Sequence, residues 1–337
     1  MRAWVVERPG PIDTKPLALV DRPEPVPGPG EIRVRVHTCG VCRTDLHLAE
    51  GDLVPKHARV IPGHEVVGTV DALGAGASRF PLGARVGIAW LRHTDGVCAY
   101  CRRGDENLCV APRFTGWDED GGFADYAVVE EQFAYALPER FGDEEVAPLL
   151  CSGIIGYRAL RRTRLQPGGR LGIYGFGASG HLAAQIALHE GATVHVLTRS
   201  KAAQQLALDL GCASAGDAAD APPEPLDAAV LFAPVGDLVP VVMRGLDRGG
   251  VCSVAGIHLT DISRLVYDDE LFEEKVLTST TANTRRDGEE LLELAVRIPL
   301  RVTTVPYAFD RAADALADVA HDRVNGAAVV RVNRERP

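Results

Sequence analysis

The period of apolar and polar positions changes along the chain. In the first third, residues 31–36 alternate between polar and apolar side chains, and apolar segments at 66–72 and 84–90 are separated by glycine-rich turns. Alternation with a period of two is typical of half-buried strands, which we expect to be antiparallel. The first 150 residues are therefore predicted to form a small β-rich domain with irregular loops.

Near residue 150 the pattern becomes helical and then alternates between strand and helix. An apolar helical pattern covers residues 147–162. Strands are predicted at 171–174, 193–197, 228–232, 251–255 and 277–281, and helices at 180–189 and 202–210, the latter capped by Gly211. Strands that alternate with helices imply βαβ units and a parallel, doubly wound sheet.

The last part of the chain returns to a β-like pattern. Residues 215–225, rich in Ala, Asp and Pro, are predicted to be a surface connection. After residue 284 the pattern gives one clear helix at 312–321, a turn at 325–326 and a terminal strand at 327–332. We therefore expect the tail to return to the first domain.

The composition favours a globular protein of two domains. The 337 residues are 46% hydrophobic, and 36 basic against 46 acidic side chains give a formal net charge of −10. At roughly 100–200 residues per domain, this length corresponds to two domains. No stretch approaches the roughly 18 apolar residues of a membrane span, and no apolar signal segment opens the chain, so we expect a cytoplasmic protein without a membrane partner. The lack of a Lys or Arg block disfavours a nucleic-acid partner.

A glycine pattern follows the predicted strand 171–174 and opens the next helix. It reads Gly175-Phe176-Gly177-Ala178-Ser179-Gly180. In this context the pattern predicts a dinucleotide site, because the glycines permit a tight turn, a close approach of the pyrophosphate and close helix packing. A glycine-rich turn without a ligand is the alternative.

The end of the second strand of this unit bears on the choice of cofactor. It reads Leu197-Thr198-Arg199-Ser200-Lys201. An NAD site usually offers a carboxylate here to the ribose 2′-hydroxyl, whereas a guanidinium with neighbouring hydroxyls suits a 2′-phosphate. NADP(H) is therefore favoured over NAD(H). Two alternatives stay open: a solvated helix start, or an Arg199 that stacks on the adenine of either cofactor.

Three further fragments carry side chains that bind zinc. They are Cys39-Gly40-Val41-Cys42-Arg43-Thr44-Asp45-Leu46-His47, Gly63-His64-Glu65 and Leu149-Leu150-Cys151. Thiolate and imidazole are natural zinc ligands, and a catalytic site uses three protein ligands and one open position. Each fragment alone has a plainer explanation, since a single buried cysteine is more often packing and a single histidine is often only hydrogen-bonded.

Together, in this order and spacing, the fragments resemble the zinc-containing alcohol dehydrogenases of the medium-chain dehydrogenase/reductase superfamily. The resemblance runs almost from end to end, and its signature is Gly63-His64-Glu65-x-x-Gly68-x5-Gly74-x-x-Ala77. It implies an α/β fold with a GroES-like β-rich catalytic domain at residues 1–150 and 285–337. It also implies a Rossmann domain with a doubly wound parallel sheet at residues 151–284.

The resemblance implies a reaction as well as a fold. The expected activity is zinc-dependent hydride transfer between an alcohol or aldehyde and a nicotinamide cofactor, in a homodimer or homotetramer. Trp90, Leu91 and Trp117 would either shape an apolar pocket near the metal or lie in the core. The alternative functions are a zinc-free quinone or enoyl reductase of the same superfamily, and a non-enzymatic binding protein that retains the fold.

Roles for individual residues also follow from the resemblance. The catalytic zinc would be bound by Cys42, His64 and Cys151. Glu65 resembles the carboxylate behind the metal, and Asp45 resembles the one that orients the ligating imidazole. Thr44 and His47 resemble the relay that carries the substrate's proton to solvent, although an ordinary exposed histidine is the alternative for His47. Cys39 matches no ligand position, so we expect a core thiol there.

A second cluster resembles the structural zinc lobe of the same family. Its members are Asp95, Cys98, Cys101 and Cys109. Asp95 stands where most members of the family have cysteine, but a carboxylate oxygen can also bind zinc. We expect zinc here, held more weakly than by four cysteines. A lobe without metal, or one in which His93 or water replaces Asp95, is the alternative.

Overall fold

A computed structural model describes residues 1–333, and the chain divides into two compact units. Unit 1 contains Met1–Cys151, Ala282–Val296 and the chain from Val302 onward, and unit 2 contains Ser152–Thr281 and Arg297–Arg301. The boundaries of the functional domains, 1–150 with 285–337 and 151–284, stay a prediction. No helix among the described residues is long and apolar enough to cross a membrane.

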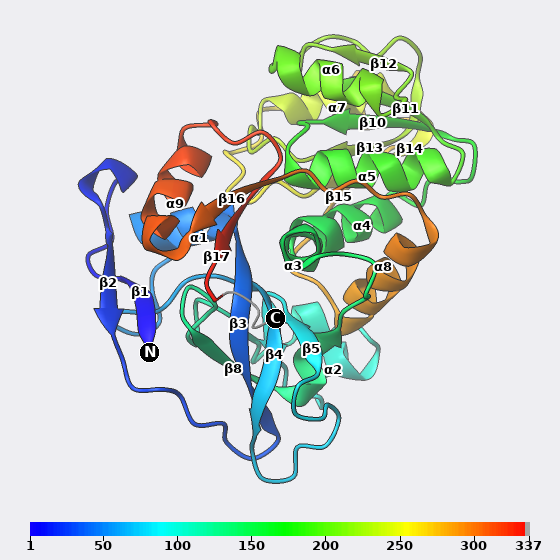
Figure 1. The fold of residues 1–337 in the computed structure, drawn as a ribbon. Helices are drawn as coiled ribbons and strands as arrows, with labels where there is room; N and C mark the ends of the chain where they lie inside the picture. Colours follow the sequence, from blue (N-terminus) through cyan, green and yellow to red (C-terminus); the bar gives the residue numbers. More distant parts are fainter. Residues whose placement is uncertain (334–337) are drawn as a thin grey trace. The chain divides into compact units, whose positions relative to one another are not determined.

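A seven-stranded sheet forms the centre of unit 1 (Figure 1). The strand order is β16-β17-β3-β4-β5-β9, with β8 also paired to β3. The bounds are β3 Glu31–Val41, β4 Glu65–Leu73, β5 Arg85–Ile88, β8 Tyr126–Glu130, β9 Ala134–Ala136, β16 Thr304–Ala308 and β17 Ala327–Arg331. The long β3 buries Ile32, Val34 and Val36 while the residues between them are half-buried, so the alternation in the sequence does mark the inward face.

Strand pairing in this sheet agrees with the sequence in two respects. The strand β3 pairs antiparallel with β4, β8 and β17. The strand β17 comes from the C-terminal tail and lies beside β3 (Figure 1), so the tail does return to the first part of the chain. The antiparallel β-rich start and the return of the tail are both confirmed.

Unit 1 also contains two short ribbons and several helices. The pairs β1 (Arg2–Val6) with β2 (Leu17–Asp21) and β6 (Leu91–His93) with β7 (Arg113–Phe114) are antiparallel. The helices are α1 Arg43–Glu50, α2 Ala99–Arg102, α3 Asp143–Val146, α8 Arg285–Arg297, whose last residue belongs to unit 2, and α9 Ala312–Ala320. The helix α1 follows β3 directly, and this places the sequence 42–47 at the end of the central strand.

A six-stranded, all-parallel sheet forms the centre of unit 2. The strand order is β12-β11-β10-β13-β14-β15. From β10 the chain first adds strands on one side, to β12, and then crosses to β13 and adds strands on the other side, as in doubly wound dinucleotide-binding sheets. The bounds are β10 Arg170–Tyr174, β11 Thr193–Leu197, β12 Ser214–Gly216, β13 Leu226–Leu231, β14 Leu246–Val254 and β15 Val276–Ser279. The helices are α4 Ser152–Arg162, α5 Ala178–His189, α6 Lys201–Asp209 and α7 Leu238–Gly245. The predicted parallel, doubly wound sheet is thus observed.

Two predictions of elements were wrong in part, and one long helix was not predicted. The helical pattern 147–162 is a 3₁₀ turn, Ala147–Leu150, and a separate helix α4, interrupted at Cys151. The surface connection 215–225 begins inside the edge strand β12. The helix α8 was missed altogether, because Gly288 and a strongly charged N-terminal turn weaken its pattern.

Candidate active site

Four side chains from three places in the sequence converge in unit 1. One ligand atom each of Cys42, His64, Glu65 and Cys151 lies within 4.8 Å of the others. The Sγ atoms of Cys42 and Cys151 are 3.8 Å apart, and His64 Nε2 is 3.3 Å from Cys151 Sγ. The break between the 3₁₀ turn and α4 falls at Cys151, so the interruption of the helix is what presents this thiol to the cluster.

The carboxylate of Asp45 orients the cluster from the first turn of α1. Its Oδ1 accepts from Gly63 N and lies 3.2 Å from His64 Nδ1, while its Oδ2 accepts from Cys42 N. Both oxygens are therefore engaged by the segments that carry ligands. An ionised carboxylate only accepts, so the proton of His64 is on Nδ1 and the Nε2 lone pair faces the thiols.

The position of Glu65 depends on a glycine in the neighbouring strand. Gly40 and Glu65 are register partners in β3 and β4, and a Cβ at Gly40 would lie 1.7 Å from Glu65 Oε2. Only glycine leaves room for this carboxylate beside the thiols. Burial raises the pKa of the Glu65 carboxyl well above its ordinary value, and the charge of Cys42 adds to the effect.

The two thiols of the cluster differ from the thiol of Cys39. A hydrogen bond from Cys151 lowers the pKa of Cys42 well below its ordinary value, which favours one thiolate in the pair. Burial instead raises the pKa of Cys39, which lies in the core, against the backbone of Gly63 and Gly122. Cys39 is outside both groups of potential ligands, in agreement with the prediction of a core thiol.

Thr44 and His47 lie on the same helix as these contacts. Thr44 is buried, with its Oγ1 3.8 Å from Cys42 Sγ. His47 lies one turn further along α1, and its Nδ1 is 2.9 Å from Asp52 Oδ2. Residues 44 and 47 share a helix face because of their i, i+3 spacing.

An aromatic stack adjoins the imidazole of His64. Trp90 meets that ring edge-on, with a centroid distance of 5.0 Å, and stacks against Phe114 at 4.9 Å and Trp117 at 6.0 Å. All three rings of the stack are half-buried, whereas Leu91 is fully buried. Of the three residues considered from the sequence, Leu91 thus belongs to the core, and Phe114 was missed.

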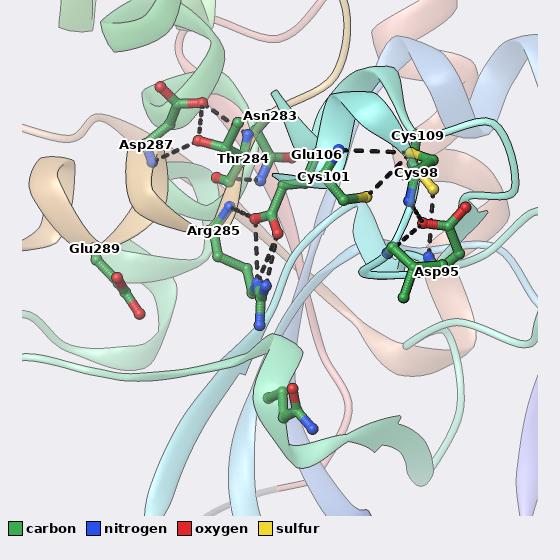
Figure 2. Close-up of polar contacts among 12 residues, drawn as sticks. Asp95, Cys98, Cys101, Glu106, Cys109, Asn283, Thr284, Arg285, Asp287 and Glu289 are labelled. Carbon is green, nitrogen blue, oxygen red and sulfur yellow. Dashed lines mark hydrogen bonds and ion pairs between the residues drawn. The ribbon is translucent and has the colours of Figure 1, made fainter. Parts of the chain in front are cut away.

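The second cluster is a loop that gathers four potential metal ligands. Asp95, Cys98, Cys101 and Cys109 form one group with ligand atoms within 4.8 Å (Figure 2). Asp95 Oδ1 accepts from the amides of Cys98 and Val97, and these contacts lower the pKa of its carboxyl well below the ordinary value. His93 is not part of the group; its Nδ1 lies 2.6 Å from Glu130 Oε1.

A side chain between two of these cysteines ties the lobe to α8. Glu106 accepts from the backbone N of Arg285, the first residue of α8, and from its guanidinium at 2.7 Å (Figure 2). The guanidinium also lies over the ring of Phe133, 4.6 Å from its centroid. Glu106 thus caps a helix that begins about 180 residues later in the chain.

The three glycines of the pattern in unit 2 have different surroundings. Gly175 has φ +89°, and a Cβ there would lie 2.8 Å from Ala233 N. A Cβ at Gly180 would lie 2.7 Å from the carbonyl oxygen of Gly175. Among residues 1–333, no neighbour lies within 4 Å of a Cβ built at Gly177, so their packing does not require glycine there, but a close ligand would. Ala178 and Ser179 then open α5.

The side chains that follow β11 differ in burial and in their contacts. Thr198 is buried, and Ser200 Oγ caps α6 by accepting from Ala203 N. Lys201 is held by Asp217, with Nζ 3.4 Å from Oδ2. Arg199 is exposed, and the side chain of Lys201 is 77% exposed.

Comparisons with known proteins agree with this geometry. Residues 28–139 match the model of the alcohol dehydrogenase GroES-like domain. The chain is 57% identical over 335 residues, 98% of its length and 97% of the relative's, to the probable alcohol dehydrogenase AdhA of Mycobacterium tuberculosis. It is 32% identical to an alcohol dehydrogenase of Geobacillus stearothermophilus, over 99% of the chain and 100% of the relative. The chain belongs to the medium-chain alcohol dehydrogenase family.

A solved alcohol dehydrogenase has the same α/β fold. The cobalt- and zinc-bound thermostable alcohol dehydrogenase of Pyrobaculum aerophilum superposes with a TM-score of 0.86 at 26% identity, over 98% of this chain and 99% of that one. The predicted fold class, a GroES-like part and a Rossmann parallel sheet, is confirmed.

The sequence did not reveal every residue that shapes this alcohol dehydrogenase site. Gly40, Phe114 and Asp52 were all missed. Gly40 lies within a motif that was inspected only for its ligands, and Phe114 has no motif at all. A signal did exist for Asp52, because it follows Gly51, a typical helix end that turns the chain back on α1.

Proposed function

We propose that this protein is a zinc-dependent alcohol dehydrogenase that transfers hydride between an alcohol or aldehyde and NADP(H), in preference to NAD(H). The observation that carries the proposal is the convergence of Cys42, His64 and Cys151 in unit 1. Two thiols and an imidazole fixed by Asp45 match the three protein ligands of a catalytic zinc that keeps one open position, and Glu65 is the fourth group in the cluster. A zinc-free reductase of the superfamily would not need this set.

Zinc bound by these three side chains would supply Lewis acidity to the substrate oxygen, and the nicotinamide would accept or deliver the hydride. The chain itself would manage the proton. Thr44 would hold the alcohol hydroxyl by a hydrogen bond and pass its proton on, and His47 would accept that proton and release it to solvent. Glu65 would be the acidic group that lies beside the metal, as the family resemblance implies.

The stack of Trp90, Phe114 and Trp117 supports an apolar substrate. It adjoins the ligand His64 and presents half-buried aromatic surface. We propose that it lines the alcohol site.

The lobe would hold a second, structural zinc through Asp95, Cys98, Cys101 and Cys109. Backbone amides already hold Asp95 Oδ1 and the Sγ atoms of Cys98 and Cys109, as suits anionic ligands. A carboxylate in place of a fourth thiolate would make this zinc more exchangeable than zinc in an all-cysteine site.

The experiment counts zinc and turnover in three variants. Wild type should hold two zincs per chain. Cys42→Ala should lose one zinc and lower turnover by more than about 10³-fold, because several kcal/mol of barrier reduction come from the metal. Asp95→Ala should lose the other zinc, and Cys39→Ala, a core thiol three residues from Cys42, should keep both. Near-wild-type turnover by a zinc-depleted Cys42→Ala protein would contradict the proposal.

A further inference from the structure

A lysine lies at the outer end of the aromatic stack that adjoins His64. The ammonium of Lys56 is 4.6 Å from the ring centroid of Trp117. Trp117 in turn stacks against Trp90, with a centroid distance of 6.0 Å, and Trp90 meets the ring of His64 edge-on. A continuous series of contacts therefore leads from an exposed cation, over two half-buried indole rings, to a proposed zinc ligand.

The loop that carries Lys56 is held on the same ring by a second contact. Trp117 Nε1 donates to the carbonyl oxygen of Val54, which is 2.8 Å away. Val54 and Lys56 are two residues apart, so the hydrogen bond and the cation–π contact act on the same short stretch of loop. The backbone at Val54, as well as the flexible stem of Lys56, thus keeps the ammonium near the stack.

The ammonium of Lys56 has no acidic partner in the part of the chain that the structure describes. The two other basic side chains of this loop do have one. Arg59 Nε is 2.9 Å from Glu7 Oε2. His57 Nε2 is 3.7 Å from Asp120 Oδ1. Lys56 is therefore the one basic side chain of the described loop whose charge is available to a ligand.

This charge stands out against the rest of the protein. The formal net charge of −10 disfavours anions over the molecule as a whole, so an anionic ligand needs a local cation. The carboxylate that follows Trp117 in the sequence does not neutralise Lys56, because Asp118 Oδ2 accepts from the amide of Phe114 at 2.9 Å. The indole face also displaces water from one side of the ammonium, which strengthens its attraction for an anion.

We infer that Lys56 is a specificity-determining residue, which selects alcohols and aldehydes that carry a carboxylate at the end remote from the reacting oxygen. The inference rests on the proposed function, in which that oxygen lies at Cys42, His64 and Cys151 and the apolar body of the substrate lies along the stack. A substrate long enough to follow the stack would bring its far end to Lys56. One ammonium whose basic neighbours are already paired matches a group with a single negative charge.

The exposure of Lys56 limits the size of the expected effect. An exposed ion pair changes a binding constant by up to about fivefold, and a charge-assisted contact shielded from water changes it by about tenfold or more. We therefore expect loss of the charge to cost anionic substrates about 3- to 10-fold in kcat/KM relative to neutral ones. The loss should appear mainly in KM, because the contact is remote from the reacting atoms and is the same in the ground state and the transition state.

The experiment uses ω-hydroxy carboxylates of increasing chain length, each compared with its neutral primary amide. The ratio of kcat/KM for the acid to kcat/KM for the amide is measured with saturating NADP in zinc-loaded wild type and variants. For chains long enough to reach the ammonium, this ratio should fall about 3- to 10-fold in Lys56→Met and further in Lys56→Glu. Lys56→Arg should retain the wild-type ratio, because it keeps the charge and can stack on an indole. Added salt should lower the wild-type ratio toward that of Lys56→Met.

Lys15→Met is the matched control, because Lys15 is likewise exposed but follows the 3₁₀ turn Ile12–Thr14, outside the stack. It should keep the wild-type ratio. An unchanged ratio in Lys56→Met at every chain length, in a protein that still oxidises the amides, would overturn the role of Lys56 and leave the proposed function intact. Failure of the zinc-loaded wild type to oxidise any of these alcohols would refute the proposed function, and the inference with it.

Discussion

Two buried tyrosines of this protein differ in one hydrogen bond. The hydroxyl of Tyr174, at the end of β10, is buried and has no hydrogen-bond partner among the described residues. The hydroxyl of Tyr135, in β9, is 3.3 Å from Asn283 Nδ2. Burial raises the pKa of both phenols, so both are neutral donors and acceptors. Removal of the two hydroxyls should therefore have opposite effects.

We expect Tyr174→Phe to raise the free energy of unfolding by about 1 kcal/mol, because the variant removes the cost of an unpaired buried hydroxyl. Tyr135→Phe should lower it by a similar amount, since a donor of Asn283 loses its acceptor. Chemical denaturation of the two variants and wild type measures the difference. A Tyr174→Phe protein that is less stable than Tyr135→Phe would show that packing of the hydroxyl outweighs hydrogen bonding.

At the scale of single residues, the sequence predicts what depends on side-chain chemistry. Cys42, His64 and Cys151 were identified through their types and motif context, and the structure brings them together. Gly40 and Asp52 could not be identified in this way. Gly40 matters through its register with Glu65 across two strands, and Asp52 matters through a reversal of the chain at Gly51.

At the scale of elements, helix α8 has a weak helical pattern in its own sequence and is capped by a side chain that is remote in the sequence. Its N-terminus is capped by Thr284 with Asp287 and, from the loop that carries Cys101 and Cys109, by Glu106 (Figure 2). Its interior Gly288 counts against a helix in the sequence. In the structure it has a packing reason, since a Cβ there would lie 2.5 Å from the ring of Tyr135. Neither the remote cap nor the ring contact can be read from residues 285–297 alone.

Glu106→Gln should loosen the first turn of α8 without emptying the lobe. The variant removes the charge from an ion pair whose carboxylate is 11% exposed, so we expect a loss of about 1–2 kcal/mol of stability. Amide hydrogen exchange of residues 285–289 should rise, while the zinc content stays the same. Asp105→Asn is the control, because Asp105 pairs only locally with Arg103 in the same turn. Equal exchange in both variants would argue against a cap by Glu106.

At the scale of the whole molecule, the proposed chemistry is divided between the two compact units. The proposed ligands Cys42, His64 and Cys151 all belong to unit 1, and the glycine pattern and Arg199 belong to unit 2. The sequence changes from a β-rich to a βαβ pattern near residue 150, where the first stretch of unit 1 ends. It could not give the short segment Arg297–Arg301, which packs with unit 2 after the chain has already returned to unit 1.

Because the two sets of residues belong to different units, variants of the proposed zinc ligands should leave cofactor affinity unchanged, and variants of the proposed cofactor residues should leave zinc content unchanged. Cys42→Ala should bind NADPH with wild-type affinity although its turnover is lost, because the glycine loop and Arg199 lie in the other unit.

Arg199→Ala should keep its zinc and weaken the binding of NADPH about 10- to 100-fold more than that of NADH, since a charge-assisted contact to the 2′-phosphate contributes about 1.5–3 kcal/mol. Lys201→Ala is the matched control, because that side chain is already held by Asp217 and should change the preference little. Fluorescence titration with both cofactors decides between the two roles of Arg199. Equal losses for NADPH and NADH would indicate that Arg199 stacks on the adenine, and the argument for NADP(H) would then fail.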